Sequence, residues 1–290
     1  MSQTTTLADL LTQAWQVRQT HFPARVEFVY PTRTLPLRST EATCALNCAH
    51  CGGHYLKGMY SLGEALKPRS TGEESYLISG GCDVQGRVPH LDHLTAIKKL
   101  AQQGGVNLHT GLVDEDVARE LGKLAQVVSF DFVVDQETID QVYGLKATPQ
   151  DFIDTYQRLR RYSHVVPHLC LGLKGGEIKG EYKALEALKE GGAEAISFIV
   201  FRPTPGTLMA QCLPPALDEV ARVLATARIM FPKTPLYLGC MRPGGRYRGQ
   251  LDSLALHAGV NKIVHPSPPA RALTEELGLT VTRGEECCSL

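Results

Sequence analysis

The sequence predicts an α/β fold, a closed (β/α)8 barrel of the TIM type, from the regular alternation of two hydrophobic patterns. Eight short apolar runs alternate with stretches in which apolar residues recur every three to four positions. Each strand and its following helix span roughly 30 residues, the repeat that a barrel of parallel strands uses. An open doubly wound sheet is the alternative, but no GxGxxG motif follows the first run.

The eight apolar runs form the predicted barrel, and further segments flank them. An additional helix over residues 7–17 and an additional strand over residues 26–30 precede the first run. We therefore expect an N-terminal extension (1–34) that packs on the barrel, the barrel itself (35–278) and a mobile C-terminal tail (279–290). The predicted strands cover residues 35–39, 76–79, 106–109, 127–134, 165–173, 195–201, 235–240 and 262–265.

Helical patterns separate these strands. Residues 91–102 place four leucine or isoleucine side chains on one stripe. Residues 114–125 open with Asp114, a residue type that caps helix N-termini, and residues 214–230 open with prolines, which suit a first turn. The remaining predicted helices cover residues 149–162, 181–190, 250–257 and 269–277.

The composition excludes several classes of protein. The 290 residues include 30 basic and 30 acidic side chains and are 43% hydrophobic, which argues against a disordered chain and against a general nucleic-acid binder. No apolar run approaches the roughly 20 residues that a membrane-spanning helix needs. The polar residues 2–6 do not resemble a secretory signal. We expect a cytoplasmic protein that binds neither nucleic acid nor membrane.

Three of the nine cysteines form a CxxxCxxC motif: Cys44, Cys48 and Cys51. They follow the first predicted strand, at the end of the barrel where (β/α)8 enzymes carry their active sites. Three thiolates on one loop can bind three irons of a [4Fe–4S] cluster and leave the fourth iron open. A structural zinc site is the alternative, with His50 or His54 as the fourth ligand.

This motif after the first strand of a βα barrel resembles the radical S-adenosylmethionine (SAM) superfamily. The resemblance implies that SAM binds the open iron and yields a 5′-deoxyadenosyl radical on reduction. It further implies that His50 lies near the adenine and that Ser79, Gly80 and Gly81 meet the amino group of SAM. Glycine suits such a position because a side chain would block close approach.

Other positions match the same family. Asp135 corresponds to an acidic residue that contacts the ribose in biotin synthase-like members, although helix capping or a salt bridge explains it equally well. Gly172 opens a glycine motif that leads into a helix beside the adenine, and residues 201–207 resemble a loop that covers it. Arg242 follows the seventh strand, where it could hold the SAM carboxylate, a cluster or an acidic carrier surface.

A second set of cysteines suggests an auxiliary iron–sulfur cluster, expected to be [4Fe–4S]. Exposed thiols at a chain end are prone to oxidation unless they are occupied. We expect the tail to fold over the barrel mouth, although a disordered tail is the alternative. Cys170 and Cys212 are expected to be structural. The predicted ligands are Cys240, Cys287 and Cys288, with Cys82 or Ser289 completing the set.

The tail resembles the subunits of two-protein lipoyl synthases, within the biotin synthase-like part of the superfamily. The chain lacks the interior cluster cysteines of biotin synthase and the N-terminal triplet of the usual lipoyl synthase. This likeness implies sulfur insertion into the octanoyl chain of a lipoyl carrier protein or peptide, with a companion radical SAM subunit and ferredoxin or flavodoxin as electron donor. The alternatives are biotin synthesis, metallocofactor maturation, or a non-enzymatic iron–sulfur or zinc module.

Overall fold

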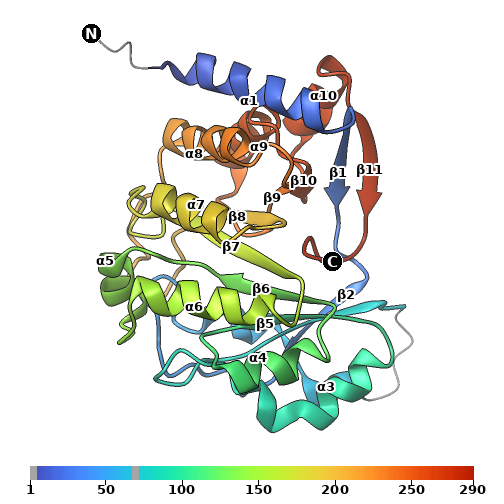
Figure 1. Ribbon diagram of the computed structural model, residues 1–290, viewed down its shortest axis with the longest axis vertical. Helices are drawn as coiled ribbons and strands as arrows, with labels where there is room; N and C mark the ends of the chain where they lie inside the picture. Colours follow the sequence, from blue (N-terminus) through green and yellow to red (C-terminus); the bar gives the residue numbers. More distant parts are fainter. Residues whose placement is uncertain (1–4, 67–71) are drawn as a thin grey trace.

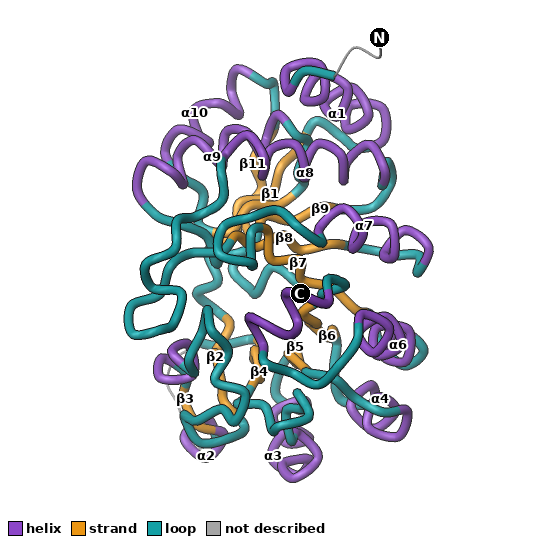
Figure 2. Tube along the Cα trace, turned by 90° about the vertical axis from the view of Figure 1, so that its left-hand side faces the viewer, coloured by secondary structure: helices purple, strands orange, loops and turns teal. Residues whose placement is uncertain are grey.

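One parallel sheet forms the centre of the protein, and helices cover its outer side (Figures 1 and 2). The computed structural model describes residues 5–66 and 72–290. The strands are β1 (Arg25–Val29), β2 (Thr34–Arg38), β3 (Tyr60–Ser61), β4 (Ser75–Ser79), β5 (Gly105–Thr110), β6 (Val127–Asp131), β7 (Val165–Leu171), β8 (Ile196–Val200), β9 (Leu236–Leu238), β10 (Lys262–Val264) and β11 (Thr280–Gly284).

The helices follow the strands along the chain. Capping boxes begin α1, through Thr6 and Asp9, and α6, through Thr148 and Asp151. The helical elements are α1 (Leu7–His21), η1 (His54–Gly58), α2 (Leu62–Ala65), η2 (His90–His93), α3 (Leu94–Ala101), α4 (Glu115–Gly122), α5 (Gln136–Thr138), η3 (Ile139–Tyr143), α6 (Pro149–Arg160), α7 (Glu181–Glu190), α8 (Leu217–Met230), α9 (Gly245–His257) and α10 (Pro268–Glu276).

The predicted barrel-type fold is confirmed. The eight predicted strands correspond to β2 and to β4 through β10, which lie side by side in chain order. Several observed strands are shorter than predicted; β6, for example, ends at Asp131 rather than at residue 134. Helix α1 packs along α8 in the outer helical layer (Figure 1). Within the described residues, no helix is both long and apolar enough to cross a membrane.

The predicted closure of the barrel is wrong for the described strands, since the curled sheet has β11 at one end and β3 at the other. The N-terminal strand β1 pairs with β10, with Val29 opposite Val264, and β11 pairs in turn with β1. The edge of β10 that would meet β2 in a closed barrel is therefore occupied. The result is an open, curled sheet with an accessible inner side.

The prediction that the C-terminal tail is mobile is also wrong. Residues 280–284 form β11, and the last six residues then turn into the inner side of the sheet, where Figure 2 places the C-terminus amid the strands. Lys262 Nζ donates to the Cys288 carbonyl oxygen at 3.0 Å. Leu290 packs against Val127 and Val166. The tail is ordered because it fills apolar and polar positions that the open sheet leaves uncovered.

Candidate active site

The CxxxCxxC loop lies beyond the carboxyl end of β2 and is held by backbone hydrogen bonds. The amide of Cys51 donates to the Cys48 carbonyl at 3.0 Å, and that of Ala49 donates to Val142 at 2.7 Å. Asn47 has a φ of 47°, a left-handed conformation that asparagine tolerates better than most residues. The three thiols are all partly buried. The loop therefore places them at the rim of the inner side of the sheet.

The glycines after β4 pack directly on this loop. A Cβ atom on Gly81 would overlap the carbonyl oxygen of Thr43, next to the first cysteine. The Gly81 amide donates to Thr40 Oγ1 at 2.7 Å, and the Ala45 amide donates to the Cys82 carbonyl at 2.8 Å. Glycine is thus required here because two backbone segments approach each other closely. The sequence had indicated a different reason, close approach to SAM.

Cys82 lies beside the first cysteine of the motif. Its amide donates to Cys44 Sγ at 3.3 Å, and the hydrogen bond from its side chain helps to lower the pKa of Cys44 to about 5. Burial and the charges of Cys44 and Cys51 raise the pKa of Cys48 to about 12. An iron–sulfur cluster would supply the positive charge that stabilises all three sulfurs as thiolates.

No three of the described His, Cys, Asp and Glu side chains surround a position where a single metal ion could bind. In a [4Fe–4S] cluster, Cys44, Cys48 and Cys51 would instead each bind a different iron. His50 is inserted beside Tyr143, with ring centroids 5.7 Å apart. Its Nδ1 is buried without a hydrogen-bond partner in the described part of the chain. An unsatisfied polar atom beside the thiols fits a ligand bound there.

A polar group inside the sheet was missed by the sequence reasoning. His109 on β5 and Asp131 on β6 face each other with Nε2 and Oδ1 3.5 Å apart, and the ring of His168 on β7 lies 5.6 Å from that of His109. The side chains of His109 and Asp131 keep 30% and 41% of their accessible surface although protein surrounds them. The inner side of the sheet is therefore open at this level.

The electrostatics of this group favour a charged pair. Burial opposes the ionisation of Asp131, but the charge of His109 and its hydrogen bond outweigh it and hold the pKa of Asp131 at about 2. Burial likewise works against the charge on His109, yet Asp131 raises the pKa of that imidazole. The available signal was the polar residues at every second position of otherwise apolar strands, such as Asn107 with His109 and Ser129 with Asp131.

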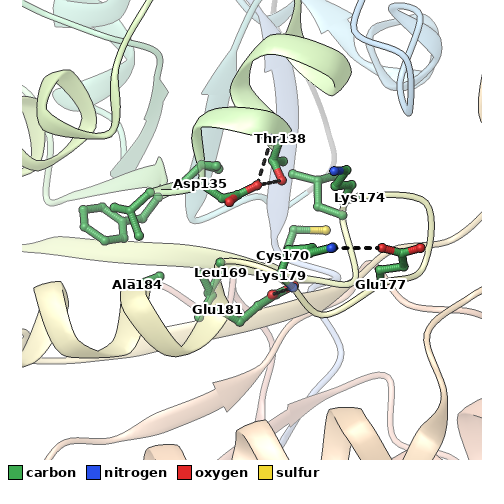
Figure 3. Close-up of a pocket in the computed structure, with 14 residues that line it drawn as sticks. Asp135, Thr138, Leu169, Cys170, Lys174, Glu177, Lys179, Glu181 and Ala184 are labelled. Atoms are coloured by element: carbon green, nitrogen blue, oxygen red, sulfur yellow. Dashed lines mark hydrogen bonds and ion pairs between the residues drawn. The ribbon is translucent and has the colours of Figure 1, made fainter.

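Asp135 lies at a small cavity between β6, β7 and α7 (Figure 3). Its carboxylate accepts hydrogen bonds from the amide and hydroxyl of Thr138, at 2.9 and 2.7 Å, and so caps α5. The cavity holds only about 30 Å³, far less than a nucleoside. Of the two roles that the sequence left open, the structure shows the cap.

Gly172, at the end of β7, is explained by its backbone. Its φ is +71°, and a Cβ atom would lie 2.7 Å from the ring of Pro215. Its amide donates to the buried carboxyl of Glu181 at 2.7 Å, and burial raises the pKa of that carboxyl. Gly172 therefore connects the end of β7 to the start of α7. The position where a side chain would stand is filled by Pro215 and does not face an open site.

Arg242 is held inside the protein, which differs from the predicted ligand-binding role. Its side chain is fully buried, with Nε and Nη2 2.7 and 3.1 Å from the carboxylate of Asp252. Further hydrogen bonds reach the carbonyl oxygens of Gly239 and Val264. The guanidinium thus joins the ends of β9 and β10 to α9, and no part of it is exposed to a ligand.

The structure divides the remaining predicted ligands into two groups. Cys82 lies with the CxxxCxxC loop, so the prediction that it joins the tail cysteines is not supported by its position. Cys287 and Cys288 lie inside the sheet with Val29 and Val264, and Cys240 is exposed at the end of β9. Ser289 is buried, with its Oγ 3.2 Å from that of Ser129. The tail therefore enters the sheet rather than covering its mouth.

Known proteins resemble this chain over nearly its whole length. It is 24% identical to biotin synthase from Bordetella avium (strain 197N) over 294 residues, 93% of this chain and 90% of the relative. It is 26% identical to biotin synthase 2 from Paracoccus denitrificans (strain Pd 1222) over 282 residues, 89% of this chain and 83% of the relative. No protein-family model matches the chain.

Solved structures share the fold. Methylornithine synthase superposes with a TM-score of 0.64 at 15% identity, over 97% of this chain and 95% of its own. The FeFe-hydrogenase maturase HydG from Carboxydothermus hydrogenoformans has a TM-score of 0.69 at 16% identity, over 95% of this chain and 72% of its own. The biotin synthase relatives, the shared fold and the CxxxCxxC loop together support the placement of this chain in the biotin synthase-like part of the radical SAM superfamily.

Proposed function

We propose that this chain is a radical SAM enzyme that forms a carbon–sulfur bond on the octanoyl chain of a lipoyl carrier protein or peptide, as a component of a lipoyl synthase. The observation that carries the proposal is the position of the tail. Cys287 and Cys288 are the last cysteines of the sequence, yet they lie inside the sheet onto which the CxxxCxxC loop opens. A substrate inside the sheet would therefore reach both cysteine groups.

Each cysteine group has a distinct task in this proposal. Cys44, Cys48 and Cys51 would hold a [4Fe–4S] cluster, while Cys287 and Cys288, with Cys240 nearest the rim, would hold the auxiliary one. With bound SAM and one electron from a donor, the first cluster would yield a 5′-deoxyadenosyl radical, and the auxiliary cluster would supply a sulfide. The chain itself fixes the CxxxCxxC loop through Gly81 and Cys82 and anchors the tail through Lys262.

The inner side of the sheet would orient the substrate and exclude water. The buried apolar faces of the surrounding helices cover the outer side of the sheet, and the ordered tail closes the base near Val127 and Val166. The octanoylated carrier would enter from the CxxxCxxC rim, where Leu208 is 86% exposed. A companion radical SAM subunit and an electron donor such as ferredoxin or flavodoxin complete the proposal.

Biotin synthesis is the second candidate, because the relatives above are biotin synthases. Against it, the inner side of β5, β6 and β7 carries Asn107, Ser129 and His168. Cys170, which shares the inner side of β7 with His168, is the only cysteine of these three strands, so they lack a set of interior cluster cysteines on separate strands.

The test is anaerobic iron–sulfur reconstitution followed by product mass spectrometry. An octanoyl-lysyl peptide and a sulfur-free biotin precursor are supplied in parallel with SAM and a reductant. The decisive variant is the double substitution Cys287→Ser with Cys288→Ser, which keeps the tail backbone and its bond to Lys262. Cys212→Ser, a partly buried thiol in a loop, is the matched control.

We expect the double variant to release 5′-deoxyadenosine normally, to contain about four fewer irons per chain and to form no carbon–sulfur bond. Full iron content and turnover in that variant would contradict the sulfur-insertion proposal. Sulfur found only on the biotin precursor would favour the second candidate. Zinc without iron, in a chain that does not cleave SAM, would identify a binding module instead.

A further inference from the structure

A buried hydrogen-bond network surrounds the Cys287 sulfur. The inference drawn from it rests on the proposed function. We propose that Asn107 is a positioning residue for the auxiliary cluster: its side-chain N–H donates to the Cys287 sulfur and raises the reduction potential of the cluster bound there. The role reaches the cluster through Cys287, so Asn107 itself touches neither the iron nor the substrate.

The geometry around Asn107 is specific. Its side chain projects from β5 to the inner side of the sheet and is fully buried. Its Nδ2 lies 3.3 Å from Cys287 Sγ, a normal length for a hydrogen bond to sulfur. The two atoms belong to residues 180 positions apart in the sequence. Only the folded sheet brings this donor to this thiol.

Ser129 on β6 fixes which way the amide points. Its hydroxyl donates to Asn107 Oδ1 at 2.9 Å, so the other end of the amide must present its N–H groups to the sulfur. The single hydroxyl proton of Ser129 is used in that bond. Ser289 Oγ, 3.2 Å away, is a second acceptor within reach of the Ser129 hydroxyl. The orientation of Asn107 thus depends on Ser129 in the neighbouring strand.

The backbone of the tail is held at the same place. The Cys287 amide donates to Thr34 Oγ1 at 2.7 Å, and Lys262 Nζ binds the next carbonyl oxygen, that of Cys288. At the sulfur itself the donor is the amide of Asn107, supplied by a fully buried side chain. A purely structural thiol in an apolar core does not need such donors. The network therefore fits a sulfur that carries negative charge, as an iron ligand does.

The electronic consequence follows from the charge on the sulfur. A hydrogen bond to a ligand sulfur stabilises negative charge, and a cluster is more negative after it accepts an electron. Removing the donor therefore destabilises the reduced form and shifts the midpoint potential to more negative values. The Cys44 loop lies outside this network, so the potential of the first cluster should not move.

The test measures the midpoint potentials of both clusters in the full chain, by reductive titration followed by electron paramagnetic resonance. Asn107→Leu removes the donor at similar volume, and Ser129→Ala removes the hydroxyl that orients it. Ser197→Ala is the matched control, because Ser197 on β8 is also fully buried but its hydroxyl has no hydrogen-bond partner in the described residues. Iron content and 5′-deoxyadenosine release are recorded for each protein.

We expect a negative shift in the second potential for Asn107→Leu, a smaller one for Ser129→Ala and none for Ser197→Ala. Loss of about four irons in Asn107→Leu, with SAM cleavage retained, also supports the inference. If Asn107→Leu fails to fold, Ser129→Ala decides the outcome. An assembled second cluster with unchanged potential in the folded variants overturns the inference and leaves the proposed function standing. A wild-type chain without a second cluster overturns the proposed function itself.

Discussion

The two cysteine regions of this protein are built in opposite ways. The Cys44 loop draws its three thiols from eight consecutive residues, and backbone hydrogen bonds within the loop and to Cys82 and Val142 shape it. The C-terminal region has two adjacent cysteines whose surroundings come from β2, β5 and β10. The first region is a sequence motif that the fold supports. The second is a site that exists only in the folded sheet.

This difference shows which contacts each region depends on. The loop depends on the close approach of Gly81 to Thr43. A small added side chain at Gly81 should therefore displace the loop and its thiols. The tail relies on long-range hydrogen bonds to Asn107 and Lys262, so it should respond to distant substitutions that leave the loop intact.

The largest effect is expected at the loop. Cys44→Ala, Cys48→Ala and Cys51→Ala should each reduce SAM cleavage at least about 100-fold, because each removes a predicted iron ligand. Cys170→Ala should retain most of the activity. The measurement is 5′-deoxyadenosine release on reduction, together with iron content. Equal loss in all four variants would indicate misfolding and undo the assignment of the motif.

Gly81→Ala should damage the loop rather than SAM binding alone. The added methyl group meets backbone, which cannot rotate away, so we expect destabilisation of about 3 kcal/mol and loss of the first cluster's iron. Gly58→Ala is the control, since nothing lies within 4 Å of a Cβ atom there. Thermal unfolding and iron analysis check both variants. Normal stability with weakened SAM affinity would return Gly81 to the predicted ligand-contact role.

Arg242→Met should destabilise the protein by about 3–5 kcal/mol, because it leaves the buried carboxylate of Asp252 unpaired. The double variant Arg242→Met with Asp252→Leu should recover part of this loss. Denaturant unfolding gives the stabilities, and equilibrium binding gives the SAM affinity. A lower SAM affinity at unchanged stability would contradict the structural role and restore the predicted one.

The smallest effect concerns the His109–Asp131 pair between the two regions. Asp131 raises the pKa of His109, so their interaction stabilises the fold fully below the unfolded histidine pKa of about 6.5 and fades as the pH rises through the folded value. Because both side chains are partly exposed, we expect about 0.5 kcal/mol. The difference in unfolding free energy between the wild type and Asp131→Asn, measured without the cluster from about pH 5.5 to 8, should show this dependence. Comparing the two proteins is necessary because buried His90, whose pKa is lowered by burial, makes the stability of both rise with pH.

Much of the fold could be predicted from local pattern. The hydrophobic periodicity located the eight barrel strands, because burial against outer helices imposes apolar residues at fixed spacing. The closure of the barrel could not be predicted in this way. It depends on whether β1 or β2 pairs with the edge of β10, and both strands have the composition to do so.

The roles of single polar residues were harder to predict. Asp135 and Arg242 both follow strands at the expected rim, yet one caps α5 and the other is sealed against Asp252. The position of a residue after a strand predicts only that it lies at the carboxyl-end rim of the sheet. Whether its side chain turns outward to a ligand or inward to a partner depends on neighbours that are distant in the sequence.

The sequence by itself determined the parallel α/β architecture and the CxxxCxxC loop, since helix and strand periodicity and the spacing of three cysteines are local properties. Only the tertiary structure decided that the sheet stays open, that the tail becomes β11 and that Cys287 meets Asn107 inside the sheet. These features join residues 180 or more positions apart. Several strands could pair with the same sheet edge, and several side chains could contact the same buried partner. Which of these contacts forms depends on their relative free energies in the folded chain, which no local sequence pattern indicates.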